Sequence, residues 1–282
     1  MQVLVAPAGF NATLRATEVA AAIGRGLEAA GLEPPDLCPV ADGGPGTLEV
    51  LLTRLGGESL AASVGDGHGR ARDVGFGLLG DRSTAIVELG AIPGELTRES
   101  SSAIGELIVA AAGTGADVIL VAAGGASTSD DGAGALDAIE AAGGLVGRRV
   151  VVLCPIRPQF TAWGRGHGGE PGGIGETLSE AFGAAIEPGA QFVLDAVGFD
   201  ARMRAARAVI VGEGRLDVGA LTGRVLGDAA TRARQSGVPA HAIVGVNRLD
   251  RFDARIIDLQ EILEAPTLEA LTAAAGMLAE RL

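Results

Sequence analysis

Acidic side chains follow short apolar runs at several points of the chain, with glycines around them. These acids are Asp42, Asp130, Asp131, Glu213 and Asp217. The apolar runs are typical of buried parallel strands, whose carboxyl ends meet at one edge of a sheet and bind ligands there. Acids gathered at one edge repel one another unless cations or arginines neutralise them. Glycine turns let backbone N–H groups approach an anion, and carboxylates hold Mg²⁺ or accept a proton, so the pattern suits a site that binds an anion beside a metal ion or a proton acceptor.

The most charged of these turns is GEGRLD, residues 212–217, directly after the apolar run AVIVG. It is not the dinucleotide-binding fingerprint, because the third glycine is missing, and the chain has no GxxxxGK[ST] motif. A nicotinamide-dependent enzyme is therefore the weakest of the functions considered. For any single glycine turn, a tight strand-to-helix connection without a ligand remains the alternative interpretation.

Composition indicates a globular protein of one large or two modest domains. The chain has 282 residues, of which 48% are hydrophobic and 20% charged. A net charge of −13 argues against nucleic acid or an anionic membrane as partner. No apolar run approaches the ~18 residues of a membrane span, and the first residues lack the basic start of a secretory signal, so we expect the cytoplasm. All 22 basic residues are arginine, and Cys38 and Cys154 lie in apolar segments typical of a core.

Strand-like runs alternate with alanine-rich helical patterns along most of the chain. Strands are expected at residues 3–6, 37–41, 118–123, 149–154, 208–212 and 240–246. Helices are expected around residues 19–30, 48–55, 102–112, 134–142, 174–185, 226–235 and 268–282. Residues 58–89 differ, because strand-length pieces broken by GDGHG and GD predict an antiparallel meander. Residues 157–173 follow no pattern and predict an irregular loop.

The expected fold class is α/β. It consists of a parallel Rossmann- or flavodoxin-like sheet with helices on both faces, plus a second, smaller α+β domain. The main domain is expected to be discontinuous, with residues 1–57, 95–148 and 188–282. The smaller inserted domain would hold residues 58–94 and 149–187.

Several colinear motifs give the chain a resemblance to the bacterial type I glycerate kinase family. The motifs are APAGFNATL at residues 6–14, DGGPGT at 42–47, GGASTSDDGAG at 124–134, VLD at 193–195 and GEGRLDVGALTGR at 212–224. Looser matches lie at residues 88–94 and 103–108. DGG together with GEGRLD is the most specific pair.

The resemblance implies transfer of the ATP γ-phosphoryl group to D-glycerate or a similar small hydroxy acid, with Mg²⁺, in a cleft between two domains. The catalytic positions it implies are Asp42, Glu213, Arg215 and Asp217, with Asp42 and Asp217 as metal ligands. The substrate- and phosphate-binding positions are Gly43, Gly44, Gly124, Gly125, Thr128, Ser129, Asp130, Asp195 and Arg224. Of these, Asp195 could face the cleft or cap the following helix. A homodimer is left open, and His68, His167 and His241 lack any ligand spacing.

The sequence departs from the family pattern at several of these motifs. Ala8, Gly9 and Asn11 stand where the family has Asp, Ser and Lys, and Pro45 stands where it has Glu. Ser129 and Arg224 replace Asn and Lys, and the segment after Cys154 is short. Two hypotheses follow: an active kinase with a rearranged site, or a catalytically impaired relative that binds a small acid, a nucleotide or a partner subunit.

Overall fold

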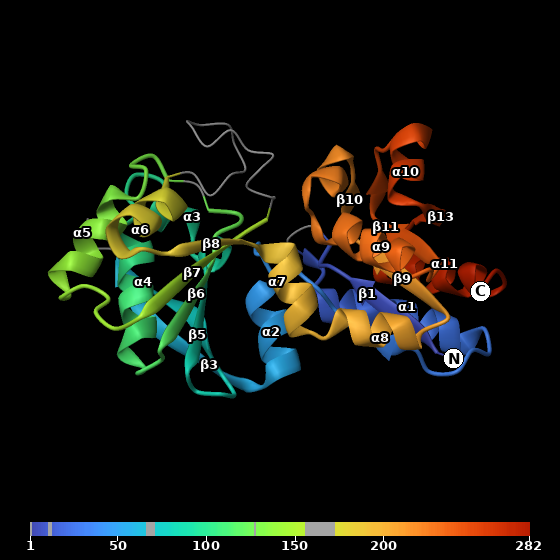
Figure 1. Ribbon diagram of the computed structural model, residues 1–282, viewed down its shortest axis with the longest axis horizontal. Coiled ribbons are helices and arrows are strands. Elements are labelled where there is room, and N and C mark those ends of the chain that lie inside the picture. Colours follow the sequence, from blue (N-terminus) through green and yellow to red (C-terminus); the bar gives the residue numbers. More distant parts are fainter. Residues whose placement is uncertain (1, 11–12, 66–70, 127, 156–172) are drawn as a thin grey trace. The chain divides into compact units, whose positions relative to one another are not determined.

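The computed structural model describes the chain except for residues 1, 11–12, 66–70, 127 and 156–172 and the side chain of residue 251. The chain forms two compact units (Figure 1). Unit 1 consists of Met1–Ala41 and Val193–Leu282, and unit 2 of Asp42–Phe192.

Unit 1 is built on a five-stranded sheet in the order β13-β11-β9-β1-β2, in which every pair is parallel. Its strands are β1 (Val3–Pro7), β2 (Asp36–Leu37), β9 (Ala208–Gly212), β11 (Ala240–Val244) and β13 (Leu259–Glu264), with β10 (Arg215–Leu216) and β12 (Val246–Asn247) as a separate parallel pair. Its helices are α1 (Ala16–Ala29), α8 (Phe199–Ala205), the 3-10 helix η4 (Val218–Thr222), α9 (Val225–Gln235), α10 (Arg251–Ile257) and α11 (Leu268–Ala279).

Helices cover both faces of the unit 1 sheet. The central strands β1, β9 and β11 are buried at every residue, as parallel strands between two helix layers are. One face packs with α1 and α11 into a single apolar core, while α9 packs against β9 and β11. Gly26 lets α1 and α11 approach closely, because a Cβ there would lie 2.2 Å from the carbonyl oxygen of Thr272.

Unit 2 is built on a six-stranded sheet in the order β3-β4-β5-β6-β7-β8. The first three strands pair antiparallel and the others parallel. Its strands are β3 (Gly57–Gly65), β4 (Ala71–Leu79), β5 (Thr84–Glu88), β6 (Val118–Ala122), β7 (Arg149–Cys154) and β8 (Ala185–Pro188). Its helices are α2 (Thr47–Leu55), the 3-10 helix η2 (Leu89–Ala91), α3 (Gly94–Thr97), α4 (Ser102–Gly113), α5 (Ala133–Ala141) and α6 (Ile174–Phe182); α7 (Gly189–Ala196) leads into unit 1.

The unit 2 sheet is also covered on both faces. Figure 1 shows α4, α5 and α6 on one side of its strands and α2 on the other. The three helices share one apolar core with Val87, Val121 and Val152 of successive strands. Among the described residues, no helix is both long enough and apolar enough to cross a membrane.

The α/β fold class is confirmed, but the predicted domain boundaries were wrong. The expected main sheet placed residues 95–148 with the first strand of the chain. Instead β6 pairs with β5 from Thr84↔Val118 to Glu88↔Ala122, so the meander and the following α/β segment form one sheet. Unit 2 is accordingly the longer of the two units rather than a small insertion.

Most predicted elements are confirmed, and the differences are local. The expected strand at residues 37–41 shortens to the two-residue β2, and β8, α7, α8, α10 and β13 were not predicted. Cys38 and Cys154 are buried as expected, and burial raises the pKa of the Cys154 thiol to about 11. Most of the segment at residues 157–173, with His167, lies outside the described residues, as do Asn11 and His68.

Candidate active site

In unit 1, the predicted charged turn lies directly at the carboxyl end of β9. β1 and β9 run in register to Pro7↔Gly212, and the Ala8 N–H then donates to the Gly212 carbonyl at 2.8 Å. Glu213 follows with only 6% of its surface exposed, and its carbonyl accepts from Gly245 N–H. The turn is therefore fixed from two sides by backbone hydrogen bonds.

Asp217 is the best-organised carboxylate of this turn. Its Oδ1 accepts from Gly219 N–H at 2.9 Å, which begins the helix η4. Its Oδ2 lies 3.0 Å from Nε of Arg215, whose side chain is 62% exposed. A Cβ at Gly219 would lie 2.8 Å from Nε of Arg224 and 2.9 Å from Oδ1 of Asp217. Asp217 and Arg224 thus lie beside Gly219, and Arg215 pairs with the same carboxylate.

Asp195 has a structural contact in unit 1. It lies inside α7, and its Oδ1 pairs with Arg232 of α9, which also contacts Asp200 at 3.1 Å. Burial would lower the pKa of Arg232, but the bonds to the two aspartates raise it overall. The N-cap of α8 is Gly198, so Asp195 does not cap that helix.

In unit 2, the predicted glycine turns pack directly on each other. The Gly124 N–H donates to the Gly43 carbonyl at 2.9 Å, and a Cβ at Gly124 would lie 2.6 Å from Cα of Gly44. Gly43 has φ +91° and approaches the backbone of Leu153 at the end of β7. The turn after Ala41 and the turn after β6 therefore form one glycine clamp, which we define as Gly43, Gly44 and Gly124.

The N–H groups of the glycine clamp are not available to a phosphate, contrary to the sequence prediction. Gly43 N–H donates to Oγ1 of Thr47 at 3.1 Å, and Gly44 N–H to Oδ1 of Asp42 at 3.2 Å. Gly124 N–H is used within the clamp itself. Of the four predicted glycines, only Gly125 has an N–H without an acceptor among the described residues.

Glu88 occupies the place beside α2 where an anion was expected. Its two carboxylate oxygens accept from Gly46 N–H at 3.0 Å and Leu48 N–H at 2.9 Å, and the residue is 7% exposed. Burial raises the pKa of the Glu88 carboxyl, although these two N–H groups oppose the shift. Pro45 fills the adjacent space, since a Cβ at Gly90 would lie 3.1 Å from its ring. The sequence prediction did not name Glu88 as a site residue, although the loose family match at residues 88–94 begins with it.

Asp130 holds two helix starts together instead of facing a ligand. Its Oδ2 accepts from Ser101 N–H, Ser101 Oγ and Gly134 N–H, and its Oδ1 accepts from Gly132 N–H. Burial alone would raise the pKa of Asp130, but these bonds outweigh it and hold the pKa below its usual range. Ser129 is likewise engaged, donating to the Arg98 carbonyl at 2.8 Å.

Thr128 is the polar group in this loop that is left without a partner. Its Oγ1 is buried and makes no hydrogen bond to the described part of the chain. Buried hydroxyls normally have a hydrogen-bond partner, so Thr128 Oγ1 is an exception within this loop.

The predicted residues therefore fall into two groups, one in each unit. Unit 1 brings together Arg215, Asp217 and Arg224 beside buried Glu213. Unit 2 brings together Asp42 and the glycine clamp, with Gly125 next along the chain, and Thr128 lies in the same loop after β6. Across the described residues, no three His, Cys, Asp or Glu side chains are grouped so as to hold a metal ion.

The similarity of this chain to known proteins extends over the sequence segments that hold both groups of site residues. The model of the glycerate kinase family matches residues 3–144 and 158–280. A glycerate kinase from Bacillus subtilis is 26% identical over 87% of this chain and 85% of its own. An uncharacterized protein from Mycobacterium bovis is 30% identical over 90% of this chain and 81% of its own. A crystal structure described as glycerate kinase 2 from Salmonella typhimurium LT2 shares the fold, with a TM-score of 0.79 at 23% identity over 100% of this chain and 98% of that one. Since the family model spans most of the sequence, including both the DGG and GEGRLD turns, the chain belongs to the glycerate kinase family.

Proposed function

We propose that this protein transfers the γ-phosphoryl group of ATP to a hydroxyl group of D-glycerate or a similar small hydroxy acid. Membership of the glycerate kinase family supports the reaction, and a kinase family implies ATP as donor. The observation that carries the proposal is the ordered Asp217 turn at the carboxyl end of a parallel strand, the edge where such sheets bind ligands.

Asp217 is proposed to orient the substrate hydroxyl and accept its proton. Phosphoryl transfer depends on alignment and charge neutralisation more than on a covalent nucleophile. Gly219 and Arg215 fix both oxygens of the Asp217 carboxylate, so its orientation is set before substrate arrives. The exposed Arg215 and Arg224 suit the substrate carboxylate or a phosphate, because guanidinium groups bind both in pairs of hydrogen bonds. Glu213 is too enclosed for this and is assigned a positioning role.

Phosphate binding in unit 2 is reassigned to Thr128 and Gly125. The hydroxyl of Thr128 and the N–H of Gly125 are donors without acceptors in the described structure. The N–H groups of the glycine clamp instead keep this loop in shape.

Mg²⁺ belongs to the proposal as a companion of ATP. Mg²⁺ usually keeps several waters and takes only one or two protein carboxylates besides the phosphates, so the lack of a three-residue cluster in the described chain fits it. That Asp42 of unit 2 and Asp217 of unit 1 are metal ligands stays a prediction of the family resemblance. The ion would neutralise charge on the phosphates, and we propose that the reaction takes place in the cytoplasm.

The test is ADP release by the purified protein with MgATP and a panel of small hydroxy acids. Activity that depends on D-glycerate and falls by about 100-fold or more in Asp217→Asn supports the proposal. Asp137→Asn is the matched control, because Asp137 is an exposed carboxylate on α5 that makes no hydrogen bond or ion pair with the described residues.

The second candidate is an impaired relative that binds a small acid or nucleotide without turnover. Ala8 and Pro45 favour it, since neither side chain can donate or accept a hydrogen bond where the family has Asp and Glu. Saturable binding of ATP or D-glycerate by calorimetry, with no ADP release for any acid tested, would establish this candidate and overturn the first.

A further inference from the structure

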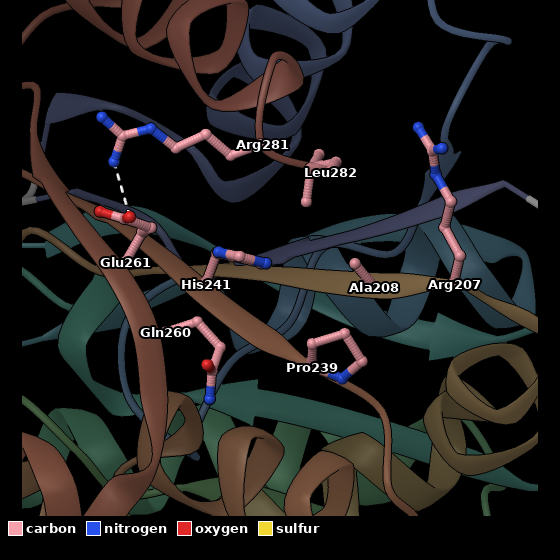
Figure 2. Close-up of a pocket in the computed structure, with 8 residues that line it drawn as sticks. All are labelled: Arg207, Ala208, Pro239, His241, Gln260, Glu261, Arg281 and Leu282. Carbon is pink, nitrogen blue, oxygen red and sulfur yellow. Dashed lines mark ion pairs between the residues drawn. The ribbon is translucent and has the colours of Figure 1, made fainter.

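A cavity of about 350 Å³ lies in unit 1 at the amino end of the parallel strands (Figure 2). It includes Arg207 and Ala208 at the start of β9, whereas Glu213 follows the other end of the same strand. Ligands of the known reaction are expected at the carboxyl edge of the sheet. The cavity therefore needs its own explanation.

An irregularity in the edge strand β13 shapes this cavity. Ala240 of β11 pairs with Leu259 of β13, and Ala242 pairs with Ile262. Between these two pairs β11 advances by two residues and β13 by three. β13 therefore has a β-bulge, with one extra residue opposite His241. In a regular strand, Gln260 and Glu261 would point to opposite faces, yet both line the cavity.

His241 gives the cavity a buried polar group without a partner. The residue is 6% exposed, and its Nδ1 makes no hydrogen bond to the chain as far as the structure describes it. Burial lowers the pKa of His241, although Glu261 opposes this, so the ring is neutral at pH 7. A neutral ring both donates and accepts one hydrogen bond.

The charges around the cavity leave one arginine unpaired. Nη1 of Arg281 lies 2.6 Å from Oε1 of Glu261, so these two charges neutralise each other. Arg207 is exposed and forms no ion pair with any residue in the described ranges. Figure 2 shows His241 between the Arg281–Glu261 pair and Arg207.

We infer that this cavity binds a small organic anion, a carboxylic acid or phosphate monoester, through Arg207 and His241. The guanidinium group of Arg207 would take the anionic group in paired hydrogen bonds. His241 would bond a hydroxyl or ester oxygen of the same molecule. The volume of about 350 Å³ lies at the lower end of the range found for small-molecule sites. The inference does not depend on the proposed kinase activity, since none of its residues belongs to that site.

The test follows the imidazole resonances of the full chain by NMR. The chain has three histidines, so His241 is assigned by the signal missing from His241→Phe, which keeps the ring volume without nitrogens. Inorganic phosphate, D-glycerate and 3-phosphoglycerate are titrated separately, which distinguishes a phosphate from a carboxylate ligand. We expect a saturable shift of the His241 signal with at least one of them.

Arg207→Ala should weaken that binding by about tenfold or more, because loss of even one charge-assisted hydrogen bond costs about that factor. Arg149→Ala is the matched control, an exposed arginine at the amino end of β7 in unit 2, and should bind as the unmodified protein does. No saturable His241 shift with any probe, or equal affinity in Arg207→Ala, would overturn the inference. Neither result would change the outcome expected in the ADP-release assay, which tests the proposed kinase activity separately.

Discussion

Replacing Asp130 should destabilise unit 2 without impairing catalysis directly. The sequence places Asp130 among phosphate-binding residues, but the structure uses both of its oxygens inside the protein. Ser101, which donates twice to this carboxylate, also accepts from Ala135 N–H at 2.8 Å. Asp130 and Ser101 therefore cap the start of α5 together and tie it to the start of α4.

The magnitude follows from the bonds that are lost. In Asp130→Ala, the N–H groups of Gly134, Gly132 and Ser101 lose their acceptor, as does the Ser101 hydroxyl. Loss of one helix cap costs about 1 kcal/mol and hydrogen bonds to a charged group are worth about 1.5–3 kcal/mol each, partly replaced by water. We therefore expect a loss of about 3 kcal/mol in the free energy of unfolding.

Urea unfolding of unit 2 at pH 7 measures this loss, and Asp137→Ala on α5 is the control expected to change stability by less than about 0.5 kcal/mol. Because the pKa of Asp130 is lowered in the folded state, its stabilisation is present above the unfolded pKa and disappears as pH falls through the folded pKa. The deficit of Asp130→Ala should therefore shrink in acid. The reasoning would be refuted if Asp130→Ala kept the stability of the wild type but lost ADP release at a temperature where it is folded. Asp130 would then be assigned to ligand binding.

Three further predictions concern the same unit. Thr128→Val should leave stability unchanged or improved, since Oγ1 has no partner in the described structure, yet raise the KM for ATP about tenfold; an unchanged KM would remove Thr128 from the site. The pKa of Glu88 is raised in the folded state, so its contribution to stability is largest below its ordinary pKa and is lost as pH rises through the folded pKa. The free energy of unfolding of the wild type relative to Glu88→Gln should therefore fall between pH 4 and pH 7 in urea titrations. A difference that stays constant with pH would contradict this. Gly124→Ala should cost about 2–3 kcal/mol because its Cβ would lie 2.6 Å from Gly44 Cα, whereas Gly94→Ala, with nothing within 4 Å, should be nearly neutral by the same measurement.

The fold was predictable where the sequence carries a periodic signal. The runs at β1, β6, β7, β9 and β11 are mainly apolar, apart from Arg149 at the start of β7 and His241 in β11, and each forms a largely buried parallel strand. Sheet membership was not predictable, because β5 and β6 are joined by long-range pairing that no local pattern encodes. β13 reads LQEILE and is only half-buried at the sheet edge, so it lacks the apolar run by which the other strands were found.

The site was predictable in composition but not in the use of its atoms. Residue types and spacing indicated that Asp42, Gly43 and Gly124 belong to turns at strand ends, and the structure brings these turns together. Whether an N–H group faces a ligand or an internal acceptor depends on contacts distant in sequence. The clearest example is Glu88, whose carboxylate accepts a hydrogen bond from the N–H of Leu48, 40 residues earlier in the chain.

The contacts of Ala8 and Pro45 explain how this chain tolerates two of its departures from the family pattern. Ala8 needs no side-chain function to hold the end of β9, because its N–H already bonds the Gly212 carbonyl. Pro45 has no N–H to offer an anion, but its ring fills the space between Gly90 and Gly125. Backbone hydrogen bonding and packing thus maintain both turns in this chain. In the proposed reaction, charge neutralisation would then come from other groups, and we propose Arg215 and Arg224, two exposed arginines of the Asp217 turn, for that role.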